Sequence, residues 1–160
     1  MSHWVFPGSF DPITSAHVEL ALRAAKMCDT LTVAVLQNRD KPAPRSLDLR
    51  CELLRKAFAG CPNIRVDGYS GVLVDYVKLQ GADAIVRGIR NTADMEYEFP
   101  WAKLHYASEG VETLFLAPTN RYPDLSSSMV RQWASLGKDI SGMVPDAIRQ
   151  DVERLYGTKL

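Results

Sequence analysis

Short apolar runs recur along this chain, and segments whose apolar residues repeat at helical spacing fill the gaps between them. The runs lie at residues 3–6, 31–36, 64–66, 84–86 and 113–116, and we expect them to be buried strands. Helices are expected at residues 18–25, 47–58, 72–79, 94–107, 127–136 and 145–155. Because parallel strands are joined by right-handed crossovers, this alternation predicts a Rossmann-like α/β fold, in which a doubly wound five-stranded parallel sheet carries helices on both faces.

The chain of 160 residues has the length of one domain, and we expect a single domain over residues 1–160. Its 46% of hydrophobic and 24% of charged residues are typical of a folded protein, and no apolar run is long enough to cross a bilayer. The first residues lack the basic and apolar segments of a signal peptide. We therefore expect the protein in the cytoplasm, without a membrane partner.

Nineteen basic residues balance nineteen acidic ones, so the chain carries no net charge that would attract nucleic acid or anionic lipid. We therefore predict no nucleic-acid partner, and any anion site must be local. The three cysteines, Cys28, Cys51 and Cys61, are widely spaced and have no nearby histidine to complete a zinc site. We interpret them as ordinary buried thiols and predict no metal-ligating residue.

Ligands of open parallel sheets bind beyond the carboxyl ends of the strands, where loops lead into helix N-termini. The first strand runs into the segment PGSFDPITSAH at residues 7–17, which is rich in glycine, proline and hydroxyl groups. Free backbone N–H groups at a helix start attract phosphate oxygens, and His17 would stand beside them in the first turn. In the alternative interpretation, Thr14 or Ser15 only caps the helix and His17 is a surface residue.

Two arginines flank a short segment directly after the fourth expected strand, in the sequence RGIR at residues 87–90. A guanidinium at the edge of a sheet must find anions, and phosphates would satisfy both Arg87 and Arg90. The alternative is internal pairing with Asp94 or Glu98. Both interpretations hold together if a carboxylate orients an arginine for its ligand.

Two further loops are expected at the same edge of the sheet. The fifth strand leads into residues 118–131, where hydroxyl side chains precede a helix and offer a second anion site, although a serine run is often only a cap and a linker. Lys41, in the loop after the second strand, adds an ammonium that would reach a bound phosphate, although a lone loop lysine is more often solvated. The convergence of these loops favours the phosphate-binding interpretation.

Three ordered motifs give the chain a family resemblance. The segments PGSFDPITSAH, RGIR followed by ADMEYE, and SSSMVR together span most of the sequence. They resemble the nucleotidyltransferases marked by T/HxGH, and among them the phosphopantetheine adenylyltransferases of coenzyme A biosynthesis. The resemblance implies transfer of AMP from ATP to 4′-phosphopantetheine, giving dephospho-coenzyme A and pyrophosphate, with a requirement for Mg²⁺ and assembly as a homohexamer.

The resemblance also implies roles for individual residues. His17, Lys41 and Arg90 would be catalytic, acting at the α-phosphate, the pentavalent phosphorus, and the β and γ phosphates, respectively. The acceptor would contact Ser9, Lys41, Leu73 and Arg87. The residues implied in binding ATP are Ser9, Phe10, His17, Gly88, Ile89, Arg90, Glu98, Tyr122, Pro123, Asp124, Leu125, Ser126, Ser127 and Ser128.

At three positions the chain departs from the family pattern. Ala16 stands where the signature has glycine, and its methyl group would crowd ATP if the nucleotide approaches closely. Pro100 and His105 stand where the family usually has glutamine and asparagine, and we expect Pro100 to restart a helix at its first turn. Two alternative functions remain: adenylyl transfer to nicotinamide mononucleotide, and a noncatalytic adenine-nucleotide sensor, which Ala16 favours.

Overall fold

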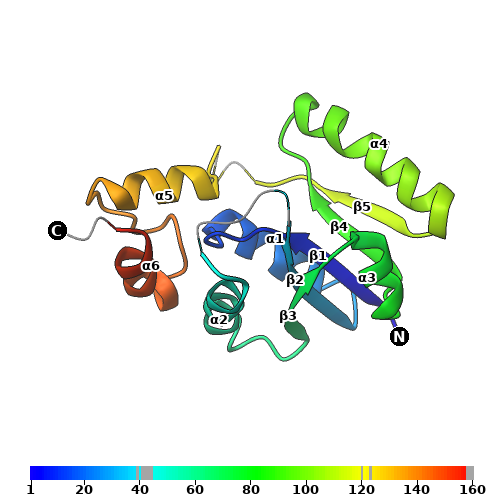
Figure 1. Ribbon diagram of the computed structural model, residues 1–160, viewed down its shortest axis with the longest axis horizontal. Helices are drawn as coiled ribbons and strands as arrows, with labels where there is room; N and C mark the ends of the chain where they lie inside the picture. The colour runs from blue at the N-terminus through cyan, green and yellow to red at the C-terminus, as the bar shows by residue number, and fades with distance from the viewer. Residues whose placement is uncertain (39, 41–44, 120, 123, 158–160) are drawn as a thin grey trace.

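Strands and helices alternate along the chain in the computed structural model, which describes residues 1–38, 40, 45–119, 121–122 and 124–157 (Figure 1). The strands are β1 (His3–Gly8), β2 (Thr30–Gln37), β3 (Ile64–Ser70), β4 (Ala84–Gly88) and β5 (Glu112–Leu116). The helices are α1 (Ser15–Ala25), α2 (Leu47–Ala57), α3 (Leu73–Leu79), α4 (Thr92–Glu109), α5 (Ser127–Ser135) and α6 (Arg149–Tyr156), with a short 3₁₀ helix, η1 (Asp146–Ile148), directly before α6.

The five strands form one parallel sheet in the order β3-β2-β1-β4-β5. Strand β1 is central, because Val5 pairs with Thr32 of β2 on one side and with Ile85 of β4 on the other. The chain winds outward from β1 to β3 and then returns to β4, so the strand order reverses between β1 and β4. Doubly wound sheets bind their ligands at such a switch point, beyond the carboxyl ends of the strands.

Side chains of the central strands alternate between two apolar cores, one on each face of the sheet. Phe6 and Val33 belong to the core that includes residues of α1 and α2, whereas Val5 and Ile85 belong to the core that includes residues of α3. Successive residues of a strand point to opposite faces, so helices cover both sides of the sheet. The predicted doubly wound parallel sheet with helices on both faces is therefore confirmed.

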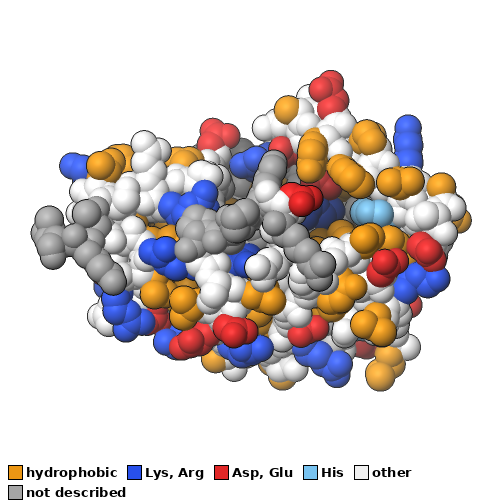
Figure 2. Space-filling view, in the orientation of Figure 1, with side chains coloured by type: hydrophobic (Ala, Val, Ile, Leu, Met, Phe, Trp, Pro, Cys, Tyr) orange, Lys and Arg blue, Asp and Glu red, His pale blue; other side chains and the backbone are white. Residues whose placement is uncertain are grey.

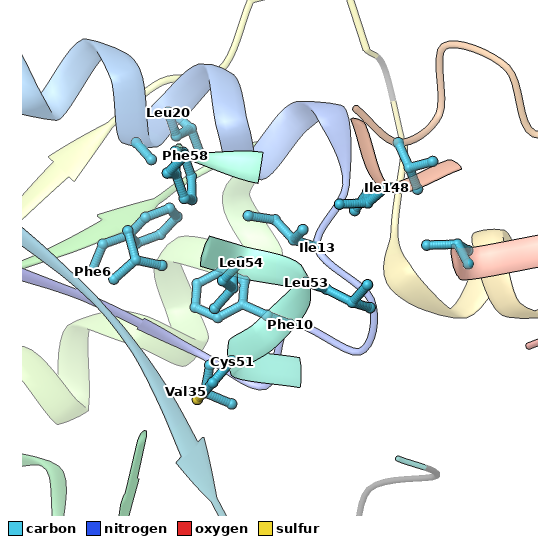
Figure 3. Packing of buried hydrophobic residues seen from close by; sticks show 14 of the residues in the cluster. Phe6, Phe10, Ile13, Leu20, Val35, Cys51, Leu53, Leu54, Phe58 and Ile148 are labelled. Carbon is cyan, nitrogen blue, oxygen red and sulfur yellow. The ribbon is translucent and has the colours of Figure 1, made fainter. Parts of the chain in front are cut away.

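The loop after β1 is itself part of the larger core. Phe10 and Ile13 pack among side chains of α2, including Leu54, as Figure 3 shows. Helices α5 and α6 extend this core beyond the end of the sheet, and in Figure 1 they lie side by side at the end where the C-terminus is drawn. The loop that carries the first sequence motif therefore lies between α2 and the C-terminal helices.

Helix α4 differs from the expectation at Pro100. The helix is continuous from Thr92 to Glu109, with Pro100 in its interior, so the predicted restart of a helix at this residue is wrong. A proline in a helix leaves the carbonyl four residues earlier without its usual donor. Here that carbonyl belongs to Glu96, which is exposed, so water can take the place of the missing N–H.

Two further findings bear on the sequence-based expectations. Among the helices of the described residues, none combines the length and the apolar character needed to cross a membrane. All three cysteines are free thiols, but only Cys51 is buried, whereas Cys28 and Cys61 are half-buried.

Candidate active site

Two cavities open at the switch point, and they share a common wall. The larger cavity has a volume of about 610 Å³ and the smaller one about 360 Å³. Both are lined by Pro7, Gly8, Ser9, Arg87 and Glu98. These residues form the junction of the two cavities, since they come from the carboxyl ends of β1 and β4 and from the facing side of α4. Two molecules bound in the two cavities would therefore meet at this junction.

The smaller cavity is built around the starts of two helices. Besides the junction, its walls come from the turn before α1, the first turn of α1, the segment after β4 and the loop between β5 and α5. The lining residues outside the junction are Phe6, Phe10, Ala16, His17, Leu20, Gly88, Arg90, Asp94, Pro118, Tyr122, Leu125, Ser126 and Ser127. Backbone N–H groups of two helix N-termini thus lie beside two arginines, an arrangement suited to a polyphosphate.

His17 caps helix α1 and also lines the smaller cavity. Thr14 is the N-cap, because its hydroxyl accepts the His17 backbone N–H (3.3 Å), and its own N–H donates to His17 Nδ1 (3.1 Å). Since Nδ1 is an acceptor here, a neutral imidazole carries its proton on Nε2. The capping alternative and the phosphate-binding interpretation of residues 14–17 are therefore compatible.

The protonation state of His17 follows from its surroundings. Burial and, to a smaller extent, the positive charges of Arg90 and Arg87 together lower the pKa of His17 to about 4. At neutral pH the ring is therefore an uncharged hydrogen-bond donor, because only Nε2 carries a proton. Such a donor can bind a phosphate oxygen without itself exchanging a proton.

Arg87 is held in place by a carboxylate and a backbone carbonyl. Its Nε and Nη2 donate to the two oxygens of Glu98 (3.1 and 2.6 Å), and its Nη1 donates to the carbonyl of Pro7 (3.0 Å). Glu98 is 9% exposed, so its carboxylate is largely shielded from water. A guanidinium has five N–H donors, and these three bonds leave two for a ligand at the junction.

Arg90 has its own carboxylate partner one helical turn later. Its Nε donates to Asp94 Oδ2 (3.0 Å), and its backbone N–H donates to the same oxygen (2.9 Å). The hydrogen bond from Arg90 and the positive charge of that arginine lower the pKa of Asp94, so the carboxylate stays ionised. Each arginine of the RGIR motif is thus oriented by a carboxylate, as one of the interpretations of this motif proposed.

Gly88 packs closely against helix α1. A Cβ atom at this position would lie 2.6 Å from Leu20 Cδ1 of α1, closer than carbon atoms pack. The absence of a side chain at Gly88 therefore lets α1 approach β4 and brings His17 near Arg87 and Arg90.

Most of the predicted ATP-binding residues line the smaller cavity. The exceptions among the described residues are Ile89, Asp124 and Ser128, which do not line it, and the backbone N–H of Ile89 donates to the carbonyl of Leu116 (2.9 Å). For all of these residues, a role in ATP binding stays a prediction. Pro123 lies outside the described residues.

Three of the four predicted acceptor residues line the larger cavity, and the fourth lies outside the described residues. Ser9, Leu73 and Arg87 line the larger cavity. Lys41 lies outside the described residues, so its place at the pentavalent phosphorus stays a prediction. Ser127 lines the smaller cavity, and its hydroxyl also donates to the carbonyl of Pro12 (2.7 Å), so it fastens the β1–α1 loop to α5.

The sequence reasoning missed the apolar wall of the larger cavity. Tyr97, Trp101 and His105 of α4 line this cavity, together with Leu73 and Leu36. The three α4 residues are spaced by four, which places them on one face of a helix, and this spacing was the signal that could have identified the wall. The cavity is therefore charged at the junction and largely apolar along α4.

Comparison with known proteins agrees with this geometry. Residues 5–133 match the cytidylyltransferase-like family. The chain is 46% identical over 154 residues to the phosphopantetheine adenylyltransferase of Deinococcus radiodurans, covering 95% of this chain and 92% of the relative. It is 43% identical over 141 residues to the phosphopantetheine adenylyltransferase of Thiobacillus denitrificans, covering 88% of each chain.

Proposed function

This chain belongs to the cytidylyltransferase-like family and, within it, to the phosphopantetheine adenylyltransferases, and from this membership we infer that it transfers the adenylyl group of ATP to 4′-phosphopantetheine. The products are dephospho-coenzyme A and pyrophosphate. The structural observation that carries this function is the pair of cavities meeting at Ser9 and Arg87. One cavity is suited to a polyphosphate, and the other joins a charged junction to an apolar wall.

The reaction is a direct displacement at phosphorus. A phosphate oxygen of the acceptor attacks the α-phosphorus of ATP, the bond from this phosphorus to the oxygen bridging to the β-phosphate breaks, and the electron pair leaves with pyrophosphate. The attacking oxygen is already ionised near neutral pH, so no protein base is needed. The barrier lies mainly in bringing two anions together and stabilising the charge at the transferred phosphorus.

We assign the charge stabilisation to the donors around the junction. His17 Nε2–H donates to the α-phosphate, and Arg90 binds the β and γ phosphates with the N–H groups that Asp94 leaves available. Arg87 holds the acceptor phosphate at the junction. Lys41, which lies outside the described residues, is assigned to the pentavalent phosphorus from the family resemblance alone. The pantetheine arm lies along the apolar wall of the larger cavity.

Mg²⁺ is proposed to enter with ATP as its counter-ion. The described residues contain no cluster of three or more histidine, cysteine or acidic side chains that would hold a metal ion. The carboxylates in the smaller cavity, Asp94 and Glu98, are engaged by arginines. Mg²⁺ often binds mainly through substrate phosphates and water, and this donor set fits that mode. Chelation of Mg²⁺ should abolish turnover without unfolding the protein.

We propose a homohexamer on the basis of the surface of α4. Apolar side chains gather over this helix in Figure 2, and the exposed ones on α4 that do not line the larger cavity are Met95, Phe99, Leu104 and Tyr106. Clustered exposed apolar side chains mark a contact surface more often than a solvated one. A mass in solution near that of one chain would contradict this assembly.

A cytoplasmic location is also proposed, because ATP is available there, and cell fractionation tests it.

The choice of acceptor is tested by pyrophosphate release in parallel assays. With ATP and Mg²⁺ present, we expect release with 4′-phosphopantetheine and at least a hundredfold less with nicotinamide mononucleotide. Pyrophosphate release only with nicotinamide mononucleotide would show that this nucleotide, and not 4′-phosphopantetheine, is the acceptor. If ATP binds in calorimetry but no acceptor supports pyrophosphate release, the protein is a nucleotide sensor. Ala16, which lines the smaller cavity, would then be the first residue to replace with glycine.

A further inference from the structure

The loop between β1 and α1 is fastened by partly buried polar contacts from separate helices. Arg50 of α2, only 1% exposed, donates to the carbonyl of Ser9 (2.8 Å). Arg131 of α5 donates to the carbonyl of Asp11 (2.7 Å), and Ser127 donates to the next carbonyl along the loop (2.7 Å). The buried guanidinium of Arg50 would be costly without bonded donors, so this arginine and the Ser9 carbonyl fix one another.

The C-terminal helix reaches the same loop through one side-chain pair. Asp11 is 2% exposed, and its Oδ1 accepts the hydroxyl of Tyr156, the last residue of α6. Burial and the hydrogen bond to Asp11 raise the pKa of Tyr156, so its hydroxyl keeps the proton that it donates. Asp11 Oδ2 has no hydrogen-bond partner among the described residues. Tyr156 therefore supplies the only side-chain hydrogen bond to this buried carboxylate within the described part of the chain.

The turn next to Asp11 is strained and lies against His17. Phe10 has a φ of 46°, in the left-handed region that a bulky side chain rarely occupies. Its ring contacts the His17 imidazole edge-on, with centroids 5.2 Å apart, and would lie 2.8 Å from a Cβ at Gly8. A strained turn persists only where its surroundings hold it, so any movement of Asp11 would move Phe10 and, with it, both Ser9 and His17.

We propose that Tyr156 is a positioning residue for the junction: acting through Asp11, it holds the strained turn at Phe10 so that Ser9 and His17 face the transferred phosphate. The proposal rests on adenylyl transfer occurring at this junction. It assigns to the last turn of α6 a part in turnover, although Tyr156 lines neither the larger nor the smaller cavity.

The test is Tyr156→Phe, which removes the hydroxyl and keeps the ring in the core. A small misplacement of reacting groups has a large effect on turnover, so we expect kcat to fall by about tenfold to a hundredfold. KM for ATP and for 4′-phosphopantetheine should change by less than about threefold, because Arg87 and Arg90 keep their carboxylate partners. A kcat within about twofold of the wild type would overturn the proposal.

A matched control separates positioning from stability. Val152→Ala removes core packing from the same helix, since Val152 is fully buried, but an aliphatic side chain makes no hydrogen bond to Asp11 that the change could remove. We expect this variant to lose a few degrees in Tm and to keep its kcat. If Val152→Ala lowered kcat as much as Tyr156→Phe, the role of α6 would be structural only, and the proposal would be wrong.

A second readout does not depend on activity. The Phe10 ring lies edge-on to His17, so the NMR resonances of the His17 ring protons depend on the position of the Phe10 ring. We expect these resonances to move in Tyr156→Phe and to stay in place in Val152→Ala. Unchanged resonances would overturn the positioning role. If the wild-type enzyme were inactive but Tyr156→Phe still shifted the His17 resonances, adenylyl transfer would be contradicted. The role of Tyr156 in holding the loop would still stand.

The partner residue provides a second pair of variants in case Tyr156→Phe does not fold. Asp11→Asn keeps an oxygen that can accept the Tyr156 hydroxyl, whereas Asp11→Ala removes it. We expect kcat of Asp11→Asn to exceed that of Asp11→Ala by at least about tenfold. Equal kcat values for the two variants would show that the hydrogen bond does not position the loop.

Discussion

Replacing His17 with alanine should lower kcat for pyrophosphate release by about a hundredfold or more, which is the usual effect of removing one donor that stabilises transition-state charge. The lost group is the Nε2–H that faces the smaller cavity. The same change removes half of the capping box of α1, so the free energy of unfolding should also fall by about 1 kcal/mol. Steady-state kinetics and thermal unfolding measure the two effects separately.

His17→Gln is the matched control for the capping function. A glutamine at the third helical position can accept the N–H of Thr14, as His17 Nδ1 does, and completes a capping box with the Thr14 hydroxyl. The free energy of unfolding of His17→Gln should be close to that of the wild type, but its kcat should stay as low as that of His17→Ala. If either variant kept kcat within about tenfold of the wild type while folded, His17 would not be a catalytic residue.

The pH dependence distinguishes a neutral donor from a charged one. Because burial and then Arg90 and Arg87 lower the pKa of His17 to about 4, the imidazole in the free enzyme stays neutral from pH 8 down to pH 6. The ratio of wild-type to His17→Gln kcat/KM for ATP, which reports groups of the free enzyme, should therefore be constant over this range. A ratio that climbs as the pH falls through 6.5 would show that the active form is the imidazolium.

Replacing Arg87 with methionine should have two effects of different origin. The acceptor phosphate loses its cation at the junction, so kcat/KM for 4′-phosphopantetheine should fall by about a hundredfold or more. Glu98 is also left as a buried carboxylate without its guanidinium, which should destabilise the fold by about 2–4 kcal/mol, less than for a fully buried pair because the Arg87 side chain is 30% exposed. Kinetics with each substrate and denaturant unfolding measure these effects.

The double variant Arg87→Met with Glu98→Gln tells the two effects apart. A neutral amide does not require a positive partner, so this variant should recover much of the lost stability. It should not recover the use of the acceptor, because no cation returns to the junction. Recovery of kcat/KM for 4′-phosphopantetheine together with stability would mean that Arg87 supports the fold and does not bind the acceptor.

The arrangement of the sheet could be predicted because each element carries a local signal. Apolar runs and helical spacing gave the alternation of strands and helices, and parallel pairing with right-handed crossovers left few arrangements. The third strand was predicted at residues 64–66 but extends to Ser70. Its later residues include Asp67 and Gly68, which an edge strand tolerates because its side chains are only partly buried.

The groups of the candidate site could be predicted, but the partners of many of them could not. The motifs pointed to Arg87 and Arg90, with Asp94 and Glu98 as possible partners, and the structure pairs Arg87 with Glu98 and Arg90 with Asp94. The Arg90–Asp94 pair has the i,i+4 spacing that a sequence can reveal. Arg87 and Glu98 lie on different elements, so their spacing does not indicate the pair. The contact of Asp11 with Tyr156 joins residues 145 positions apart, and no local pattern indicates it.

The buried arginine of α2 shows the same limit. Arg50 lies in a helix whose amphipathic pattern would place a charged residue at the surface, yet it is one of the largest fully buried side chains. It is buried because the carbonyls of Ser9, Arg45 and Ser46 together accept its donors, and these lie in two separate loops. Only the folded chain brings these acceptors together.

The central claim is that two anionic substrates lie end to end across the junction, and a crystal structure with dephospho-coenzyme A tests it most directly. We predict adenosine in the smaller cavity, the pantetheine arm along Tyr97 and Trp101 in the larger one, and the phosphoanhydride between Ser9, His17 and Arg87. A product molecule lying within one cavity, or with its phosphoanhydride away from these three residues, would contradict the account.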